Sequence, residues 1–426
     1  MSHPIPEVYV LWHPECALGE VLARKIHGWL RPGNGLGPQV FYRSLPAPDA
    51  PQGGLPPPLP GEWRPDSGMA AVLGDRAENM LIVVLLIDDH MIADAAWRHW
   101  VARLASPSGL AGPCVFMPVA LDSTAYNVPA PLGELNFLRP AGLPLPKIDA
   151  PGPGGPIEVV ERSLLKQLTE SLCRIMLGNA TVPPDQNGVV GADAAAGTPP
   201  KIMLFLSHAK SDGTAPAKRI RDYIYSQTQL AAFYDENDIP FGSAFSRVLQ
   251  SNITGAQTAA LVAVRTARYA TRPWCRRELS LFRRPVQEIS APGAAEHWRV
   301  HPVVVVDALE ETALTPGIPE LGNATLIRWS EQVIDQAEQI VTVVLRDALL
   351  ASYHAAVGRT MPADPASIVL NWLPDPTTLL SIPRIRAANA ELRVFYPGRG
   401  MSGLELDILD EYFPKLAFHS FDQATS

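Results

Sequence analysis

Apolar residues in the middle of the chain fall into two patterns, short continuous runs and longer stretches with a helical period. Short apolar runs indicate buried strands, and apolar residues recurring every three or four positions indicate helices. Strands that alternate with helices predict a parallel sheet covered on both faces. In chain order the pattern predicts a strand at 202–206, a helix at 215–225, a strand at 231–234, a helix at 245–253, a strand at 259–264, a helix at 274–282, strands at 303–306 and 325–329, and a helix at 330–358.

The first region of the chain repeats this order of elements. Strands are predicted at 8–11, 39–42, 80–87, 114–121 and 135–138, and helices at 18–30, 95–104 and 157–177. Two short segments also match: VLWHPE at 10–15 is similar to FLSHAK at 205–210, and VFYRS at 40–44 is similar to AFYDE at 232–236. Trp97 follows Ile87 by the same ten residues that separate Trp274 from Val264. This similarity predicts two copies of one fold, with an unrelated α/β domain as the alternative.

Proline-rich and glycine-rich stretches separate these regions. Proline fixes one backbone torsion and removes a donor, so the stretches at 46–65, 140–156 and 183–200 cannot hold a helix or a central strand. The third stretch is typical of an interdomain linker. The predicted fold class is α/β, with flavodoxin-like parallel sheets that carry helices on both faces. The predicted limits are a first domain at 1–183, a linker at 184–200, a main domain at 201–358 and a small C-terminal α/β unit at 359–426.

Composition narrows the class of protein. Hydrophobic residues make up 47% of the chain and charged residues 18%, which favours folded cores over charge-rich disorder. The net charge of −8 argues against a binder of duplex DNA, so nucleic acid is not an expected partner. The four cysteines are scattered, which predicts no disulfide framework and no metal site, and favours a cytoplasmic location. The longest aliphatic run, 80–87, is too short to cross a bilayer, and the N-terminus lacks a secretory pattern, so no membrane is expected.

Three polar motifs follow the strands of the middle region. They read FLSHAKSDG at 205–213, YDENDIPFGSAF at 234–245 and ATRPWCRREL at 270–279. In order and spacing they resemble the Toll/interleukin-1 receptor (TIR) domain of the bacterial, NAD-consuming kind. That family commonly has a serine followed by His or Tyr after its first strand, an acidic loop after its second, and a W-x-x-x-E stretch, here Trp274 to Glu278. The resemblance is good over the middle region and faint over the first.

By this resemblance, Glu278 is the expected catalytic carboxylate for cleaving the bond between nicotinamide and ribose in NAD+. The cleavage builds positive charge on the ribose, which a carboxylate stabilises, and the nicotinamide departs neutral. Trp274 and Glu278 are four positions apart on a helix and therefore share a face. Ligands of open parallel sheets bind at the carboxyl ends of the strands. The residues expected to bind substrate there are Phe205, Ser207, His208, Lys210, Asp235, Asp238 and Trp274. NAD+ is the substrate, and no cofactor is expected.

A basic set surrounds the helix that carries Glu278. Its members serve solubility and salt pairing, or they grip the NAD pyrophosphate or a neighbouring subunit. The set consists of Arg265, Arg268, Arg272, Arg276, Arg277, Arg283 and Arg284.

The first region departs from the active pattern at each aligned position. Trp12 stands where Ser207 would align, Arg43 stands in place of Asp235, and Val101 stands in place of Glu278. Without the carboxylate we expect no NAD cleavage there. The first region is therefore expected to be a degenerate TIR-like domain that serves regulation or assembly.

The pattern of the last unit predicts strands at 368–372, 392–396 and 416–421 and a helix at 404–413. This unit contains a Gly-x-Gly-x-x-Gly motif formed by Gly398, Gly400 and Gly403. The motif follows a predicted strand and opens a predicted helix, and Asp422 follows the next strand, which is the context of a dinucleotide fingerprint. Pro397 before the first glycine and the short remaining chain favour a plain turn instead. A nucleotide bound there would act as an activator and not as the substrate.

The sequence therefore predicts a cytoplasmic NAD+ glycohydrolase of prokaryotic anti-phage defence, giving nicotinamide and ADP-ribose or a cyclic product. By the resemblance, activity requires self-association through TIR–TIR contacts into oligomers or filaments, with a nucleotide or protein as trigger. A non-enzymatic TIR scaffold acting in signalling is the main alternative. A deoxyribosyltransferase-like enzyme, which also uses one carboxylate, and a nucleotide-sensing module remain open.

Overall fold

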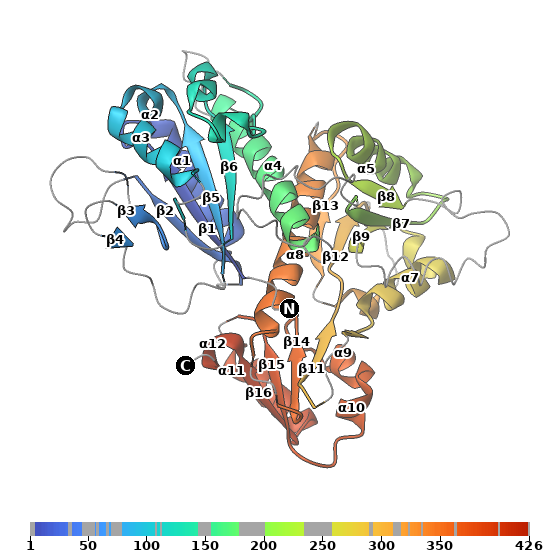
Figure 1. Ribbon diagram of the computed structural model, residues 1–426. Helices are drawn as coiled ribbons and strands as arrows, with labels where there is room; N and C mark the ends of the chain where they lie inside the picture. Colours follow the sequence, from blue (N-terminus) through green and yellow to red (C-terminus); the bar gives the residue numbers. More distant parts are fainter. Residues whose placement is uncertain are drawn as a thin grey trace. The chain divides into compact units, whose positions relative to one another are not determined.

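The computed structural model divides the chain into two compact units, one built mainly from His3–Ser171 and the other mainly from Pro199–Ser426 (Figure 1). The predicted linker at 184–200 and the predicted helix at 245–253 lie outside the described residues. The structure describes residues 5–32, 36–44, 56, 59–64, 68–69, 79–106, 109–110, 113–143, 155–178, 201–233, 258–288, 293–309, 317–322, 324–333, 335–361, 364–398 and 401–424.

The first unit is built on a four-stranded parallel sheet with the strand order β2-β1-β5-β6. Its strands are β1 (Pro6–Trp12), β2 (Gln39–Arg43), β5 (Met80–Ile87) and β6 (Cys114–Ala120). All eight residues of β5 are buried, as expected for an apolar strand inside a sheet covered on both faces. The predicted strand at 135–138 is wrong: only Leu138 pairs, in an isolated bridge to Val119. A separate antiparallel pair consists of β3 (Trp63–Arg64) and β4 (Gly68–Met69).

Four α-helices accompany this sheet within the described residues. They are α1 (Ala17–Leu30), α2 (Asp89–Ala93), α3 (Ala95–Leu104) and α4 (Pro156–Gly178), with short 3-10 turns at η2 (Ser123–Asn127) and η3 (Leu132–Glu134). Trp97, Trp100 and Val101 of α3 pack into one core cluster with the sheet residues Tyr9 and Val83. The helix α3 therefore covers that face of the sheet.

The middle sheet has five parallel strands in the order β13-β12-β9-β7-β8. They are β7 (Met203–His208), β8 (Ala231–Phe233), β9 (Thr258–Arg265), β12 (Val303–Asp307) and β13 (Thr325–Arg328). This order confirms the predicted flavodoxin-like arrangement. Four of the strands, β8-β7-β9-β12, occur in the same chain order as β2-β1-β5-β6 of the first unit.

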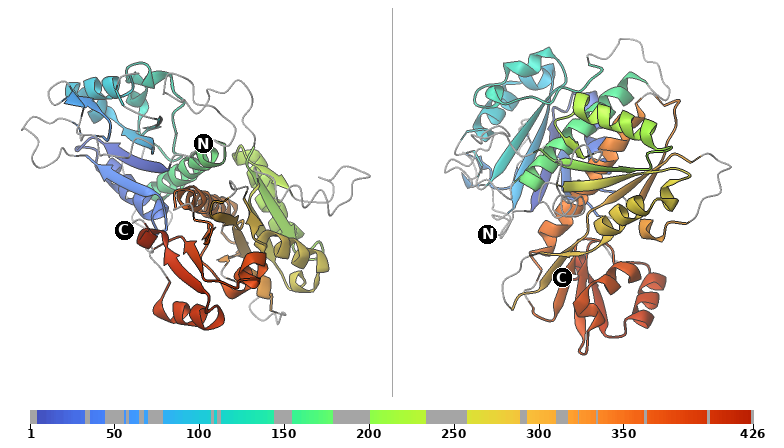
Figure 2. Two further views of the ribbon diagram at one scale, coloured as in Figure 1. Left: turned by 60° about the horizontal axis from the view of Figure 1, so that its bottom comes forward. Right: turned by 90° about the vertical axis from the view of Figure 1, so that its right-hand side faces the viewer.

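Helices cover both faces of the middle sheet (Figure 2). Cys275, Leu279 and Phe282 of α7 (Pro273–Arg283) share a core cluster with Phe205 and Leu261, so α7 lies on the face to which these strand residues point. The helices α5 (Thr214–Gln227) and α8 (Gln336–Gly358) contact each other and the sheet. The helix predicted at 330–358 is α8, and it begins at Gln336, six residues later than predicted.

The helix α8 is long and apolar enough, by length and composition, to cross a membrane. Several of its residues, including Ile340, Val341, Val344 and Leu345, are fully buried, and the helix contacts β9 and β12. Burial against a sheet accounts for its apolar composition, so we interpret α8 as a core helix.

A third sheet has the order β10-β11-β14-β15-β16. Its last three strands are β14 (Ser367–Leu370), β15 (Leu392–Tyr396) and β16 (Leu416–Ser420), as predicted. Its first two, β10 (Val286–Gln287) and β11 (Glu296–Arg299), come from the segment between α7 and β12 and were not predicted. Sheet membership therefore does not follow the expected limits of 201–358 and 359–426. The accompanying helices are α9 (Pro376–Ser381), α10 (Pro383–Arg386), α11 (Gly403–Tyr412) and α12 (Phe421–Ala424).

Candidate functional site

The strongest candidate site lies at the carboxyl ends of β7 and β9. Ser207 is the second-last residue of β7, and β9 leads into the 3-10 turn η5 (Tyr269–Thr271), which is followed by α7. Pro273 occupies the first turn of α7, where a missing backbone donor costs nothing and the fixed torsion suits a helix. The buried residues Cys275 and Leu279 hold this helix to the sheet, and Glu278 adjoins that buried stripe.

Ser207 joins two side chains that are distant in the sequence. Its hydroxyl donates a hydrogen bond of 2.6 Å to Oε2 of Glu278. Its Oγ also lies 2.9 Å from the phenol oxygen of Tyr269. Ser207 is 1% exposed and Tyr269 is fully buried, while Glu278 is partly exposed. The three residues form a polar row that runs from the core to the surface, with the carboxylate at the outer end.

The surroundings of Glu278 change its acidity. Burial raises the pKa of its carboxyl to about 7, and the hydrogen bond from Ser207 opposes that rise. Glu278 therefore changes charge near neutral pH, which is a common property of groups in functional sites. An ionised Glu278 carries negative charge in a poorly solvated position, where it interacts strongly with a nearby positive charge.

Two residues of this site were not among the predicted site residues. Tyr269 is one of them, and Asp212 is the other. Asp212 Oδ1 accepts a hydrogen bond of 2.9 Å from Thr266 Oγ1, and its Oδ2 accepts one of 3.0 Å from the backbone N–H of Arg268. Asp212 thereby ties the loop after β7 to the loop after β9. The acidic position in FLSHAKSDG was the sequence signal that could have identified it.

The predicted substrate-binding residues fall into different environments. Phe205 is 1% exposed and stacks on Phe233, so its side chain belongs to the core beneath the site. His208 ends β7, and Lys210 is exposed in the loop that follows. Asp235 and Asp238 lie outside the described residues.

Trp274 lies one helical turn before Glu278, as predicted, and is 51% exposed. The guanidinium of Arg277 lies 5.4 Å from the centre of its ring, within the range of a cation–π contact. One aromatic surface and one cation therefore stand together at the start of α7, beside the carboxylate.

The arginines around α7 have separate partners. Arg276 pairs with Glu320 at 2.7 Å, Arg265 with Asp307 at 3.8 Å and Arg283 with Asp375 at 3.6 Å. Arg272 donates to Ser211 at 3.3 Å. Salt pairing therefore occupies three members of the set, while Arg272 and Arg277 stand at the end of α7 nearest the site.

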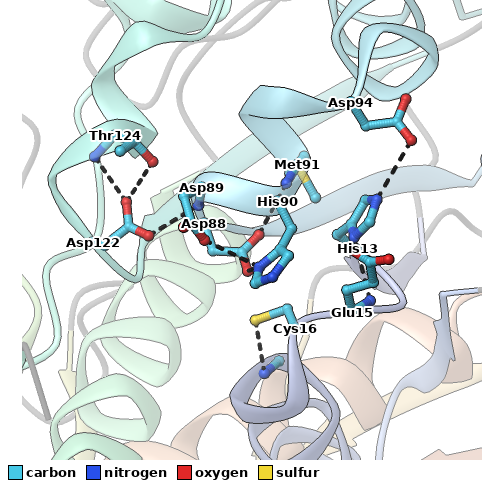
Figure 3. A network of polar contacts seen from close by, with 11 residues as sticks. His13, Glu15, Cys16, Asp88, Asp89, His90, Met91, Asp94, Asp122 and Thr124 are labelled. Carbon is cyan, nitrogen blue, oxygen red and sulfur yellow. Dashed lines mark hydrogen bonds and ion pairs between the residues drawn. The ribbon is translucent and has the colours of Figure 1, made fainter.

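The carboxyl edge of the first unit has a different set of side chains (Figure 3). His13 follows β1, Asp88 follows β5 and Asp122 follows β6. Asp88 Oδ1 accepts from the backbone N–H of Met91 at 3.1 Å, and Asp122 Oδ1 accepts from Thr124 N at 2.8 Å. These carboxylates cap the turns that follow the strands, which is a structural role.

One group of side chains at this edge could offer metal ligands. Asp88, Asp89 and His90 place one ligand atom each within 4.8 Å of one another. Nδ1 of His90 lies 2.8 Å from Asp88 Oδ2 and 3.0 Å from Asp89 Oδ1, and the hydrogen bond with Asp88 raises the pKa of His90. Because a protonated imidazole places a positive charge beside both carboxylates, the contacts require no metal.

Two of the three aligned positions of the first unit, Trp12 and Val101, are apolar. Val101 is 2% exposed within the core cluster of α3, and Trp12 is 5% exposed. In this unit the described residues at these two positions supply neither the serine hydroxyl nor the carboxylate of the middle site.

Two glycines of the motif lie in the described residues, Gly398 after β15 and Gly403 at the start of α11. Gly398 has a φ of 90°, a conformation that favours glycine, and Gly400 lies outside the described residues. Ser402 and Glu405 cap the start of α11 reciprocally, since each side chain bonds to the other's backbone N–H. The backbone N–H groups of Ser402 and Glu405, which a phosphate at this helix terminus would use, are therefore already hydrogen-bonded within the chain.

Comparison with known proteins assigns the middle domain. The family model of the TIR domain matches residues 204–341, which hold Ser207, Tyr269 and Glu278. The chain therefore contains a TIR domain. That match covers about a third of the chain, and the parallel α/β sheet of the first unit has no family assignment. None of the curated proteins matches the chain.

Proposed function

We propose that the TIR domain is an NAD+ glycohydrolase that cleaves the bond between nicotinamide and ribose, with Glu278 as its catalytic carboxylate. The observation that carries this proposal is the 2.6 Å hydrogen bond between Ser207 and Glu278 at the carboxyl edge of the sheet. TIR domains are often NADases, and open parallel sheets bind their ligands at this edge. The raised pKa of Glu278, about 7, adds to this support.

The chemistry requires one carboxylate. Departure of neutral nicotinamide leaves positive charge on the ribose, and an ionised Glu278 stabilises that charge in the transition state. Glu278 Oε2 is held by Ser207, and within the described part of the chain Oε1 has no hydrogen-bond partner. Oε1 is therefore the oxygen that would accept from a ribose hydroxyl. Water or an atom of the same substrate then takes up the ribose cation, giving ADP-ribose or its cyclic form.

Binding of NAD+ would use groups at the start of α7 and the end of β7. The half-exposed ring of Trp274 offers a surface for a flat base, and Arg272 and Arg277 offer cations for the pyrophosphate. His208 and Lys210 border the same edge. In the family, the acidic loop that here contains Asp235 and Asp238 closes the site or meets the next subunit.

The test is NAD+ consumption over time by the full chain at high protein concentration, with nicotinamide and ADP-ribose products resolved. The variant Glu278→Gln keeps the size of the side chain and removes its charge. The exposed Glu411 on α11 gives a matched control, Glu411→Gln. We expect turnover by wild type and by the control only. Equal turnover by Glu278→Gln would contradict the assignment of the carboxylate.

We further propose that the activity serves anti-phage defence in the cytoplasm of a prokaryote and depends on self-association through TIR–TIR contacts. The TIR domain itself supports such contacts in general. If neither wild type nor control consumes NAD+ at any protein concentration, and the protein still assembles, a scaffold function is favoured instead.

A further inference from the structure

The buried end of the polar row at the TIR site holds a phenol whose hydroxyl, among the residues that the structure describes, contacts a serine and no carboxylate. Tyr269 is fully buried in η5, between β9 and α7. Its hydroxyl lies 2.9 Å from Ser207 Oγ, across a sequence separation of 62 residues. A buried phenol requires a hydrogen-bond partner, and within the described ranges Ser207 Oγ is that partner.

The direction of each hydrogen bond follows from the number of protons. A serine hydroxyl has one proton, and Ser207 donates it to Glu278 Oε2. Ser207 Oγ is therefore an acceptor toward Tyr269, and the phenol is the donor. If Glu278 were protonated and donated to Ser207, the serine proton would turn toward Tyr269 and compete with the phenol proton for the same space.

We propose that Tyr269 is a positioning residue of the TIR site: by donating to Ser207 Oγ it commits the serine proton to Glu278 and so favours the ionised carboxylate. The phenol does not touch the substrate. It acts through Ser207, as one member of a chain of hydrogen bonds that polarise one another. The proposal rests on the proposed function for its relevance to catalysis, but the effect on Glu278 exists whether or not NAD+ is cleaved.

Other ionisable groups lie close to this row and could contribute to its titration. Burial raises the pKa of the Cys275 thiol to about 12 and the pKa of the Tyr269 phenol further above its usual value, so both stay protonated near pH 7. Glu320 of η6 (Pro319–Leu321) is paired with Arg276, and Arg272 lies at the start of α7. His208 follows Ser207 on β7, and a His208→Gln background removes its imidazole from the measurement.

The variant Tyr269→Phe removes the donor and keeps the ring in the core. We expect the pKa of Glu278 to rise by about one pH unit, the size typical of one lost hydrogen bond to a charged network. The measurement is the carboxyl resonance of Glu278 in the full chain labelled with 13C-glutamate, identified by its absence in Glu278→Gln. Tyr225→Phe is the matched control, since Tyr225 donates at 2.8 Å to the carbonyl of Ala232 on β8, outside the polar row. An unchanged Glu278 pKa in Tyr269→Phe overturns the proposal.

Two further variants separate positioning from a purely structural role. In a Ser207→Ala background the relay is already broken, so adding Tyr269→Phe should move the Glu278 pKa no further. Replacing Tyr269 alone by 3-fluorotyrosine keeps the hydroxyl and makes it a stronger donor, so the Glu278 pKa should fall below that of wild type. An additional shift in the double variant, or a rise with the fluorinated residue, contradicts the relay.

Turnover gives the second readout. With Tyr269→Phe, NAD+ cleavage at pH 6.5 should fall about tenfold, while the rate near pH 9 stays within about twofold of wild type, because the carboxylate is ionised there in both. A loss of the same factor at every pH indicates a structural role and overturns the proposal. If wild type does not cleave NAD+, the proposed function fails, and the Glu278 resonance still decides the role of Tyr269.

Discussion

The first unit and the TIR domain each contain a parallel sheet, and four strands of the two sheets have the same order. The two sheets differ in the side chains at their carboxyl edges. The strand order β2-β1-β5-β6 corresponds to β8-β7-β9-β12, and in both sheets the central pair is in equivalent register: Leu11 pairs with Leu85, and Leu206 pairs with Val262. The match of VLWHPE with FLSHAK aligns Leu11 with Leu206, and the equal spacing from β5 to Trp97 and from β9 to Trp274 aligns Leu85 with Val262. The shared register supports duplication of one fold.

The two sheets carry different side chains at the carboxyl ends of their equivalent strands. The TIR edge holds a row of Tyr269, Ser207 and Glu278, with the carboxylate at the outer end. At the edge of the first unit, Val101 is buried in the core and the carboxylates of Asp88 and Asp122 cap local turns. The sheet therefore determines where a site can lie, while a few polar side chains determine its chemistry.

The largest expected effect comes from placing the missing carboxylate in the first unit. Val101→Glu buries a charge with no partner prepared for it, so we expect a loss of about 3–5 kcal/mol in the local free energy of unfolding and no gain of NAD+ cleavage. Hydrogen exchange of the α3 amides measures the loss. Val21→Glu, at a 39% exposed position of α1, is the control and should change stability by less than about 0.5 kcal/mol. If Val101→Glu were stable and the first unit cleaved NAD+, the missing carboxylate alone would account for the difference between the two edges, contrary to our expectation.

The next effect concerns the pH dependence of stability in the TIR domain. The pKa of Glu278 is raised from 4.5 to about 7 in the folded protein, so the folded state holds this proton more tightly than the unfolded chain. The stabilisation that the protonated Glu278 gives to the folded state is complete below about pH 4.5. It falls by about 3 kcal/mol in the free energy of unfolding as the pH rises to about 7. Hydrogen exchange of the α7 amides should show this decline in wild type and not in Glu278→Gln. The same decline in both proteins would place its origin in another group.

The third effect tests the serine that the first unit lacks. Ser207→Ala removes the hydrogen bond that lowers the pKa of Glu278, so that pKa should rise above its wild-type value. The rate of NAD+ cleavage should therefore begin its increase with pH at a higher pH, with about a tenfold loss at neutral pH. Ser280→Ala is the control on the same helix, because Ser280 bonds to the carbonyl of Arg276 and not to Glu278. An unshifted pH profile would show that Ser207 acts only in packing.

The smallest effect concerns the tie between the two loops of the TIR edge. Asp212→Asn keeps the shape and weakens the hydrogen bonds to Thr266 and to the backbone of Arg268, at a cost of about 1 kcal/mol. We expect a lower rate from looser placement of Tyr269, with the pH profile unchanged in position. Asp222→Asn on the exposed side of α5 is the control. A profile that moves with Asp212→Asn would indicate direct coupling of this carboxylate to Glu278.

Much of the fold could be predicted because its elements have strong patterns. The strand at 392–396 and the helix at 95–104 were predicted with the bounds that they have, since an unbroken apolar run and a regular helical period mark them. The strands β10 and β11 have two and four residues, too few to show a period. Only tertiary pairing makes them strands: β11 pairs with β14, and β10 pairs with β11.

The candidate site was predictable in part for a related reason. Trp274 and Glu278 belong to one local motif, and their spacing on a helix can be read directly. The partners of Ser207 are 62 and 71 residues away, and only the sheet brings them together. The contact with Ser207 decides whether Tyr269 is an inert core residue or a hydrogen-bond donor, and this contact cannot be read from the sequence.

The route of the chain after α7 has a consequence for how this protein can be cut or recombined. Directly after the helix that carries Glu278, the chain contributes β10 and β11 to the third sheet and then returns to the middle sheet as β12. A gene truncated at residue 358 would still encode β11 but not β14, the strand on which β11 pairs. The segment after residue 358 therefore cannot be replaced by itself without breaking the third sheet. A natural or engineered exchange of that segment must include the strands β10 and β11 as well.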